Sequence, residues 1–519
     1  MTHRFVFTIL AAALAAPPML HAAPLAPEQQ VVHVLNRLAF GPRPGDVERV
    51  RRIGVQQYID EQLHPETIPL PAGLSARLDA LETPKRSAGA ALGDYLELRK
   101  EVRNEEEGAK QRRRVEQQRA AREEAEARLL RAIESSRQLE ELMVDFWYNH
   151  FNVYAGKGIA RALVASYERD AIRPYVLGSF RSLLGATAKH PAMLFYLDNV
   201  VSSTPRPKAR GRAQGLNENY ARELMELHTL GVDGGYTQRD VTELARMLTG
   251  WTYDQRRLVR DGETFRFDAG RHDQGTKTWL GHEIAPAGQL EGEYALDVLA
   301  MHPATARHIS FQLAQYFVSD APPPALVERM QQAWLASQGD IRTVLKTLFA
   351  SAEFMDESAL GAKFKTPYQF VVSAARASSA PLTNVAPLAN AMSQLGMPLY
   401  GCQTPDGYKN TQEAWLNPDA LTRRIAFATA LAQGRLPLAS KPVMGPPPPM
   451  QNLAGSDAAP AMFMPPPPAA PPAPVPVDPA RLQATLAGAL SPATLATLSR
   501  HPDNLRAAMV LGSPDFMQH

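Results

Sequence analysis

Residues 217–248 read NENYARELMELHTLGVDGGYTQRDVTELARML and contain two segments with the same apolar spacing. In each segment apolar residues recur every three or four positions, which is the period of an α-helix with one buried face. Thr237 precedes the second segment and Asp240 follows three residues later, close to a capping box that opens a helix. The stretch therefore predicts two amphipathic helices, over residues 218–230 and 238–248, joined by a glycine-rich turn.

Helical spacing of this kind recurs along most of the chain. It predicts further helices over residues 29–40, 47–62, 109–148, 191–197, 304–318, 341–349 and 419–433. Strand signals are few, and the clearest are residues 264–267 and 277–280, which flank a polar, glycine-rich turn and which we expect to pair. The predicted fold class is therefore mainly α: a multi-helix globular domain with a small β-hairpin.

Residues 444–477 are much richer in proline than the rest of the chain, with runs at 446–449 and 465–468. Sequence of this kind is extended and lacks a packed core, so we expect a proline-rich disordered segment near the C-terminus. Beyond it, residues 511–517 (LGSPDFM) echo residues 349–355 (FASAEFM), which indicates a shared packing device. C-terminal helices that dock back on the main body are the simplest interpretation.

These features predict a division of the chain into four parts. Residues 1–23 form a signal peptide, 24–440 a helical main domain, 441–478 a proline-rich disordered loop or linker, and 479–519 C-terminal helices docked on the main domain. A short basic loop at 205–212 is expected to be a mobile surface loop, the alternative being a site for an anionic polymer.

The first two dozen residues have the layout of a secretory signal peptide. His3 and Arg4 give a basic start, residues 5–16 are an apolar run too short to cross a bilayer, and residues 20–24 offer a small-residue cleavage site. The alternative, an uncleaved anchor, needs a longer apolar run. We expect an exported protein, periplasmic or secreted, and no transmembrane segment, because no later stretch is long and apolar enough.

The charge and cysteine content exclude several classes of protein. Lysine and arginine number 55 and aspartate and glutamate 53, a net charge of +2, so no global field gathers nucleic acid or an acidic membrane. We therefore expect no nucleic-acid partner. The single cysteine, Cys402, cannot form an internal disulfide and lies in a turn-like sequence, so we expect an inert thiol.

The densest cluster of polar residues lies on the first helix of the opening stretch. Advancing about 100° per residue places Asn219, Arg222, Glu223 and Glu226 on one stripe of that helix. His228 falls on the other side, so it cannot join the carboxylates in a zinc site of the His-Glu-x-x-His type. We expect His228 to be a satisfied core histidine.

Two carboxylates on one helix face support more than one chemistry. Glu223 and Glu226 would divide acid and base roles, as in glycoside hydrolysis, if their surroundings separate their pKa values. They are equally suited to hold a divalent cation, the one cofactor that the sequence raises, with help from another segment. The alternative is structural, with Arg222 paired to Glu218 and Glu226 on a solvated face.

Several motifs along the chain match a known family. They include HVLNRLAFGP at 33–42, FWYNHF at 146–151, the polar helix at 217–228, LTGW at 248–251, His272-Asp273 and WLNP at 415–418. On these residues the sequence, from about Gln29 onward, resembles the bacterial family known as domain of unknown function 1800. The resemblance implies an exported protein, often encoded beside a sulfatase-like family, and implies no activity or catalytic residue.

Two functions remain open. The first is an extracytoplasmic hydrolase that acts on a polysaccharide or other envelope polymer through the helix-borne carboxylate pair, with His272 and Asp273 closing the site. Its candidate catalytic residues are Glu223, Glu226, Arg222, His272 and Asp273, and its candidate binding residues are Asn219, Asn217, Lys277 and Trp251. The second is a non-catalytic envelope interaction or assembly protein that works with a sulfatase-like partner through its charged helix and proline-rich segment.

Overall fold

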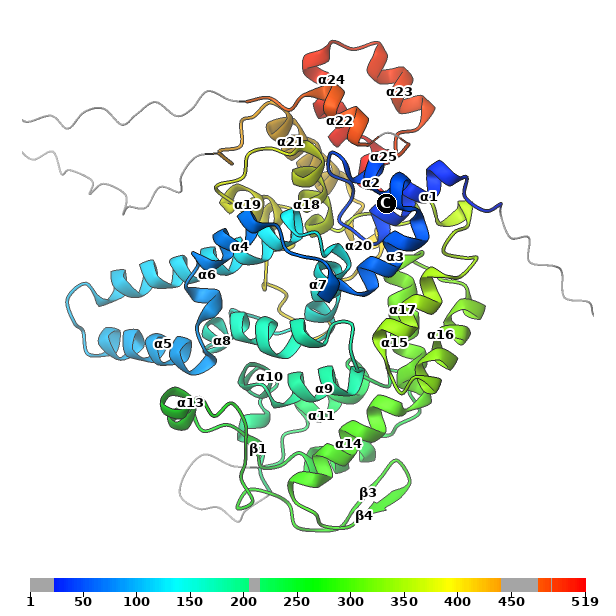
Figure 1. Ribbon diagram of the computed structural model, residues 1–519. Helices are drawn as coiled ribbons and strands as arrows, with labels where there is room; N and C mark the ends of the chain where they lie inside the picture. The colour runs from blue at the N-terminus through cyan, green and yellow to red at the C-terminus, as the bar shows by residue number, and fades with distance from the viewer. Residues whose placement is uncertain (1–22, 205–214, 440–474, 487) are drawn as a thin grey trace, which may run out of the picture.

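The computed structural model describes residues 23–204, 215–439, 475–486 and 488–519. Helices dominate these residues, and the strands among them form two short antiparallel pairs (Figure 1). The mainly α fold class that the sequence predicts is confirmed. The predictions for the signal peptide, the basic loop and the proline-rich segment fall wholly or largely outside the described residues.

The N-terminal part of the chain is a succession of helices. These are α1 (Pro27–Arg37), α2 (Asp46–Ile53), α3 (Val55–Leu63), α4 (Ala72–Asp79), α5 (Ala88–Arg103), α6 (Ala109–Glu134) and α7 (Gln138–His150). The single helix predicted over residues 47–62 is wrong, because the chain breaks at Gly54 between α2 and α3. Gly54 has a φ of 88°, a conformation that glycine adopts readily and that other residues rarely adopt.

The charged segment predicted as one helix over residues 109–148 is also two helices, α6 and α7. The backbone is extended at Ser135, and the Gln138 side chain donates to the carbonyls of Ala132 and Ser135 at 3.1 and 2.8 Å. Because carbonyls at a helix end lack partners within the helix, these bonds stabilise the break. α6 contacts α5, and the two project from the body as an arm (Figure 1).

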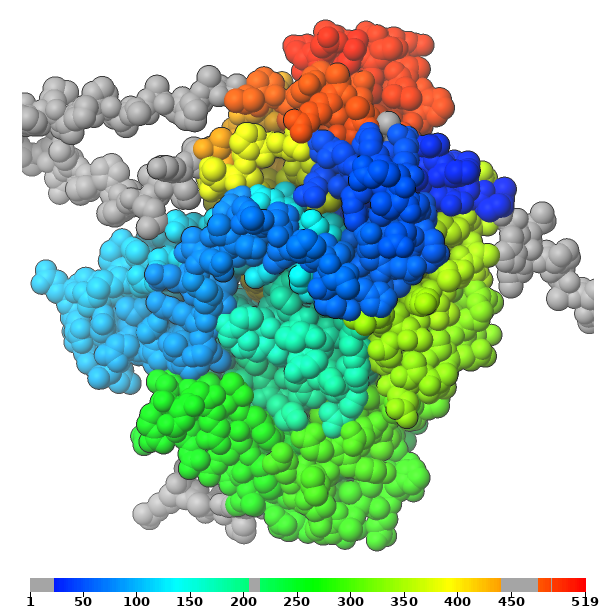
Figure 2. Space-filling view, in the orientation of Figure 1, coloured from blue at the N-terminus to red at the C-terminus, as the bar shows by residue number. Residues whose placement is uncertain are grey.

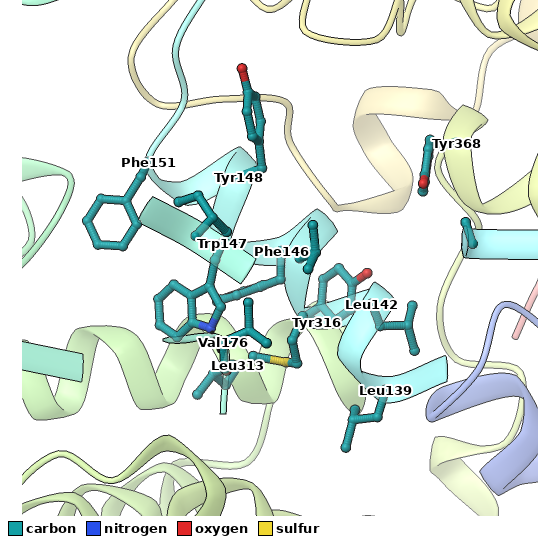
Figure 3. Close-up of a cluster of buried hydrophobic side chains, with 14 of the residues drawn as sticks. Leu139, Leu142, Phe146, Trp147, Tyr148, Phe151, Val176, Leu313, Tyr316 and Tyr368 are labelled. Atoms are coloured by element: carbon teal, nitrogen blue, oxygen red, sulfur yellow. Dashed lines mark hydrogen bonds between the residues drawn. The ribbon is translucent and has the colours of Figure 1, made fainter. Parts of the chain in front are cut away.

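The middle of the chain consists of further helices. These are α8 (Ala160–Ser166), α9 (Phe180–Lys189), α10 (Pro191–Tyr196), α11 (Asn219–Glu226), α12 (Gln238–Met247), α13 (Gln255–Asp261), α14 (Gln289–Met301) and α15 (Pro303–Phe317). Figure 3 shows the core around α7, where Trp147 is fully buried and donates its Nε1–H to the carbonyl of Val176 at 3.1 Å. Truncating such a ring costs about 3–5 kcal/mol, so α7 anchors the fold.

The strands exist where the sequence predicts them, but they do not pair as predicted. β1 (Trp251–Thr252) pairs with β2 (Arg266–Phe267), and β3 (Lys277–Trp279) pairs with β4 (His282–Ile284). The hairpin expected between 264–267 and 277–280 is therefore wrong. β3 and β4 are joined by only two residues, both with positive φ, and so short a loop costs less entropy to close than the predicted one.

The remaining helices complete one side of the molecule and its C-terminal group. These are α16 (Pro324–Ala336), α17 (Ile341–Phe349), α18 (Pro367–Ser378), α19 (Ala386–Gln394), α20 (Gln412–Trp415), α21 (Pro418–Ala432), α22 (Pro479–Thr485), α23 (Pro492–Ser499), α24 (Asp503–Leu511) and α25 (Pro514–Met517). α24 packs on α21, and α22 contacts α18. Figure 2 shows this last group, in orange and red, lying against the blue N-terminal helices. None of the helices in the described ranges is both long and apolar enough to span a bilayer.

Candidate active site

A cavity of about 290 Å³ lies between α7, the end of α11, α15 and the loop over residues 402–410. Most of the residues that line it have polar side chains, and α7 and α15 supply nearly half of these residues from side chains spaced to share one helix face. These are Asp145, Phe146, Asn149 and His150 from α7 and His308, Gln312, Gln315 and Tyr316 from α15. Of the site residues predicted from the sequence, only Glu226 lines this cavity.

The loop over residues 402–410 reaches the cavity from a distant part of the sequence. Asn149 holds it by two bonds to Tyr408, donating to the main-chain carbonyl at 2.8 Å and accepting from the main-chain N–H at 2.7 Å. Asn152 donates to two further carbonyls of the loop, at 3.0 and 2.8 Å. Because this backbone has no helix or strand to pair with, these bonds fix the position of Asp406.

The carboxyl groups of Glu223, Glu226 and Asp406 lie close enough for their charges to interact, and the last two line the cavity while Glu223 does not. Burial, followed by the charges of Glu226 and Asp406, raises the pKa of Glu223, against the opposing charge of Arg222. Burial also acts to raise the pKa of Asp406, but hydrogen bonds led by the one from Lys409, at 2.7 Å, hold that pKa below its usual value. The surroundings therefore push the pKa values of Glu223 and Asp406 apart.

Two buried histidines, His150 and His228, and the half-buried His308 lie beside the carboxyl groups. The Nε2–H of His150 donates to the carbonyl of His228 at 3.1 Å, and burial lowers the pKa of His150 well below its usual value. Burial also lowers the pKa of His228, to about 3, and that of His308. The three rings are therefore neutral at pH 7. His228 is buried as predicted, although its Nε2 has no hydrogen-bond partner among the described residues.

The helix that carries Glu223 and Glu226 is shorter than predicted, because α11 ends at Glu226 and not at residue 230. The Thr229 hydroxyl donates to the carbonyl of Leu224 at 2.6 Å and so satisfies a carbonyl at the helix end. Gly231 follows with a φ of 84°, and a Cβ there would lie 2.9 Å from Nδ1 of His308. The glycine therefore allows His308 to approach the end of α11.

The other polar residues of α11 make structural contacts. Arg222 pairs with Glu218 at 3.3 Å and donates to the Gln238 side chain at 2.9 Å, which ties α11 to the start of α12. The Asn217 side chain accepts from the main-chain N–H of Asn219 at 2.9 Å, at the first turn of α11. None of these residues lines the cavity. These contacts support the alternative in which Arg222 is structural. Its ion-pair partner is Glu218, as that alternative predicts, and among the described residues Glu226 is not a second partner.

Four more of the predicted site residues lie outside the cavity lining: His272, Asp273, Lys277 and Trp251. His272 and Lys277 contact the two oxygens of the Glu291 carboxylate, at 3.0 and 2.7 Å, and all three side chains are fully buried. Asp273 accepts two hydrogen bonds from Arg246, at 3.0 and 3.1 Å. These contacts hold β3 against α12 and α14, and the structure does not bring these residues to the carboxyl groups of α11.

The cavity also contains residues that the sequence did not mark as a site. His150 belongs to the FWYNHF motif, and its membership of this family motif is the one sequence signal that could have marked it as a site residue. Asp406 carries no comparable signal, because its neighbours in the cavity lie far away in the sequence. Within the described ranges, no group of three or more histidine, cysteine, aspartate or glutamate side chains is arranged to hold a metal ion.

Residues 33–518 match the family described as Protein of unknown function (DUF1800). The chain belongs to this family. The DUF1800 match runs from α1 to α25 and so includes both the cavity and the C-terminal helices. No curated protein and no solved structure matches the chain. The resemblance seen in the sequence motifs is confirmed, and the function has to be argued from the cavity.

Proposed function

We propose that this DUF1800 protein is an exported hydrolase that cleaves a hydroxyl-rich envelope polymer, such as a polysaccharide, with Glu223 as its general acid. The observation that carries the proposal is the separation of two pKa values, lowered for Asp406, which lines the cavity, and raised for Glu223, which lies one helical turn before the lining residue Glu226 on α11. Carboxyl groups separated in this way divide the acid and base roles of glycoside hydrolysis. Export rests on the signal-like residues 1–23.

In the proposed reaction Glu223 gives its proton to the oxygen of the leaving group. Asp406, which is ionised, takes a proton from the water that attacks the anomeric carbon, so one water is consumed for each bond broken. Glu226 lines the cavity together with Asp406 and stabilises the positive charge that develops on the sugar ring. Asn149 acts as a positioning residue, because it holds the loop that carries Asp406.

The shape of the site supports a polymer as the substrate. Val232 and His308 line both the cavity and a second hollow of about 310 Å³, so the two hollows adjoin. The second hollow includes Phe311, whose side chain is partly exposed and offers an apolar surface to a sugar ring. Gln312 and Gln315 in the first cavity supply amide donors and acceptors for hydroxyl groups.

The test is release of reducing ends from a panel of envelope polysaccharides by the purified mature protein. Glu223→Gln and Asp406→Asn each remove one ionisable group and should lower kcat by about 10²–10⁴-fold, the usual contribution of a general acid or base. The matched control is Glu283→Gln, a change on exposed β4, which should leave kcat unchanged.

The pH dependence of kcat/KM separates the two roles. The rate should fall as pH rises through the raised pKa of Glu223, because the acid must be protonated. It should also fall as pH drops through the lowered pKa of Asp406, because the base must be ionised. The alkaline limb should disappear in Glu223→Gln. If the wild type cleaves no polymer, or if both variants keep full activity, the hydrolase proposal is wrong and the non-catalytic assembly role is favoured.

A further inference from the structure

A second cavity, of about 410 Å³, lies where the arm formed by α5 and α6 meets α8. It shares no lining residue with the cavity at Glu226. Small and apolar side chains make up much of its wall: Ala91, Tyr95, Leu98, Ala120, Ala121 and Ala162. Its volume lies within the range of small-molecule sites, about 300–1,000 Å³, and apolar walls with a few polar groups are typical of such sites.

Two of the cations in this cavity are already neutralised by the protein. Arg86 forms an ion pair with Asp94. Arg119 pairs with Glu82 at 3.0 Å and with Glu116 at 2.9 Å. Because ion pairs cancel most of their charge, neither guanidinium is left to attract a ligand.

Glu124 and Arg161, which also line the cavity, have no such partners. Glu124 is only 8% exposed, and among the described residues it makes no hydrogen bond or ion pair. Burial, then the charge of Glu168, raises its pKa to about 8, although the charge of Arg161 acts in the opposite direction. Arg161 is exposed, has no ion-pair partner in the described part of the chain, and does not approach Glu124 closely enough for a salt bridge. Burying a carboxyl group without a hydrogen bond costs free energy, and a bound ligand that donates a hydrogen bond to Glu124 would reduce this cost.

We propose that this cavity binds an α-amino acid with a large apolar side chain, with the ligand's ammonium group on Glu124 and its carboxylate on Arg161. One carboxyl group and one guanidinium, unpaired and close enough to interact, match the two opposite charges of a zwitterion. Tyr95 and Leu98 provide the apolar wall for the side chain. A plain amine would leave Arg161 unpaired, and a plain carboxylic acid would leave Glu124 unpaired.

The test is isothermal titration calorimetry of the mature protein with L-phenylalanine, 2-phenylethylamine and 3-phenylpropanoate. The amino acid should bind at least about tenfold more tightly than either single-charge analogue, because each analogue loses one charged hydrogen bond. Binding at pH 7 in buffers of different ionisation enthalpy should release up to about one proton, since the ammonium group favours the ionised form of Glu124. Equal binding of all three probes, or no binding at millimolar concentration, overturns the proposal.

Three variants locate the two charges. The Glu124→Gln variant should bind L-phenylalanine no more tightly than 3-phenylpropanoate and should release no proton on binding. The Arg161→Gln variant should bind L-phenylalanine no more tightly than 2-phenylethylamine. Glu126→Gln is the matched control, because this half-buried carboxyl group lies on the same helix but outside the cavity lining. The Glu126→Gln variant should bind all three probes as the wild type does. Wild-type binding by Glu124→Gln contradicts the proposal, and the comparison of probes on the wild-type protein tests it even if a variant fails to fold.

Discussion

The Arg128 side chain lies buried on α6 between two carboxylates, at 2.8 Å from Asp145 and 2.9 Å from Glu168. Tyrosine rings surround its guanidinium at 5.2–5.3 Å: Tyr148, Tyr368 and Tyr400. Burial alone would lower the pKa of Arg128, but the charges around it, led by that of Glu168, raise it well above its usual value. Asp145 also lines the cavity at Glu226, so this ion cluster supports one wall of the candidate site.

Replacing Arg128 by methionine should destabilise the protein by about 3–5 kcal/mol, because Asp145 would remain buried without its cation and Glu168 would keep only Arg173, at 3.1 Å. The measurement is the free energy of unfolding in urea. Arg119→Met, on the same helix, removes a guanidinium whose ion pairs are largely exposed, and it should cost less than about 1 kcal/mol. Similar costs for the two variants would contradict this account of the cluster.

At the scale of elements, the repeated motif forms the same turn at two places in the fold. The Ser351 hydroxyl donates to the carbonyl of Leu348 at 2.6 Å and accepts from the N–H of Phe354 at 3.2 Å. Ser513 donates to the carbonyl three residues earlier at 2.8 Å and accepts from the N–H of Phe516 at 3.1 Å. Both phenylalanines are buried. The shared packing device predicted from the echo of the two sequences is therefore a serine-capped turn that directs a phenylalanine into the core.

Ser351→Ala and Ser513→Ala should each destabilise the protein by about 1 kcal/mol, the usual cost of losing a capping hydroxyl. Thermal unfolding measures the effect. Ser393→Ala is the matched control, because this exposed hydroxyl bonds only to the preceding turn of its own helix, and it should change stability by less than about 0.5 kcal/mol. If Ser351→Ala and Ser513→Ala reduce the stability by very different amounts, the two turns are not equivalent.

At the scale of the whole molecule, buried and half-buried neutral histidines are spread through the fold. Burial lowers the pKa of His33, His150, His190, His228, His302, His308 and His519. For three of them, His33, His190 and His228, the pKa falls to about 3. Between this value and their ordinary pKa of 6.5, the unfolded chain binds protons that the folded chain does not bind. Their contribution to stability is therefore full above pH 6.5 and is lost as pH falls.

We predict that the free energy of unfolding falls between pH 7 and pH 5, with each histidine whose pKa is near 3 contributing about 2 kcal/mol of the loss. Glu124, whose pKa rises to about 8, acts in the opposite direction, because the folded chain keeps a proton there. The smaller upward shifts of Glu126, Glu140 and Glu223 act in the same direction as Glu124, and together these groups offset only part of the loss. Urea unfolding at each pH measures the profile. His228→Gln should decline less steeply than the wild type, whereas His282→Gln, at an exposed position, should not. If the free energy of unfolding of the wild type does not change between pH 7 and pH 5, the buried histidines are not kept neutral in the folded chain.

Helix periodicity and caps predicted many of the helices from the sequence alone, because they act between residues a few positions apart, but they did not predict others such as α5, α14, α16 and α18. α17 was predicted at its exact bounds, and the Thr237 capping box of α12 is present. The same local logic placed Glu223 and Glu226 on one face of α11. It missed the breaks at Gly54 and Ser135, where local signals for a turn were outweighed by the apolar spacing on either side.

The tertiary structure alone decided which residues meet. It brought Asp406 to the end of α11 through the bonds of Asn149 to a loop far along the chain, and it buried His272 and Lys277 against Glu291. Such contacts depend on burial and charge between segments that no short-range pattern relates. The sequence by itself therefore determined many of the helices and the carboxylate pair, while long-range packing decided that Asp406 shares a cavity with Glu226 and that the pKa values of Glu223 and Asp406 separate.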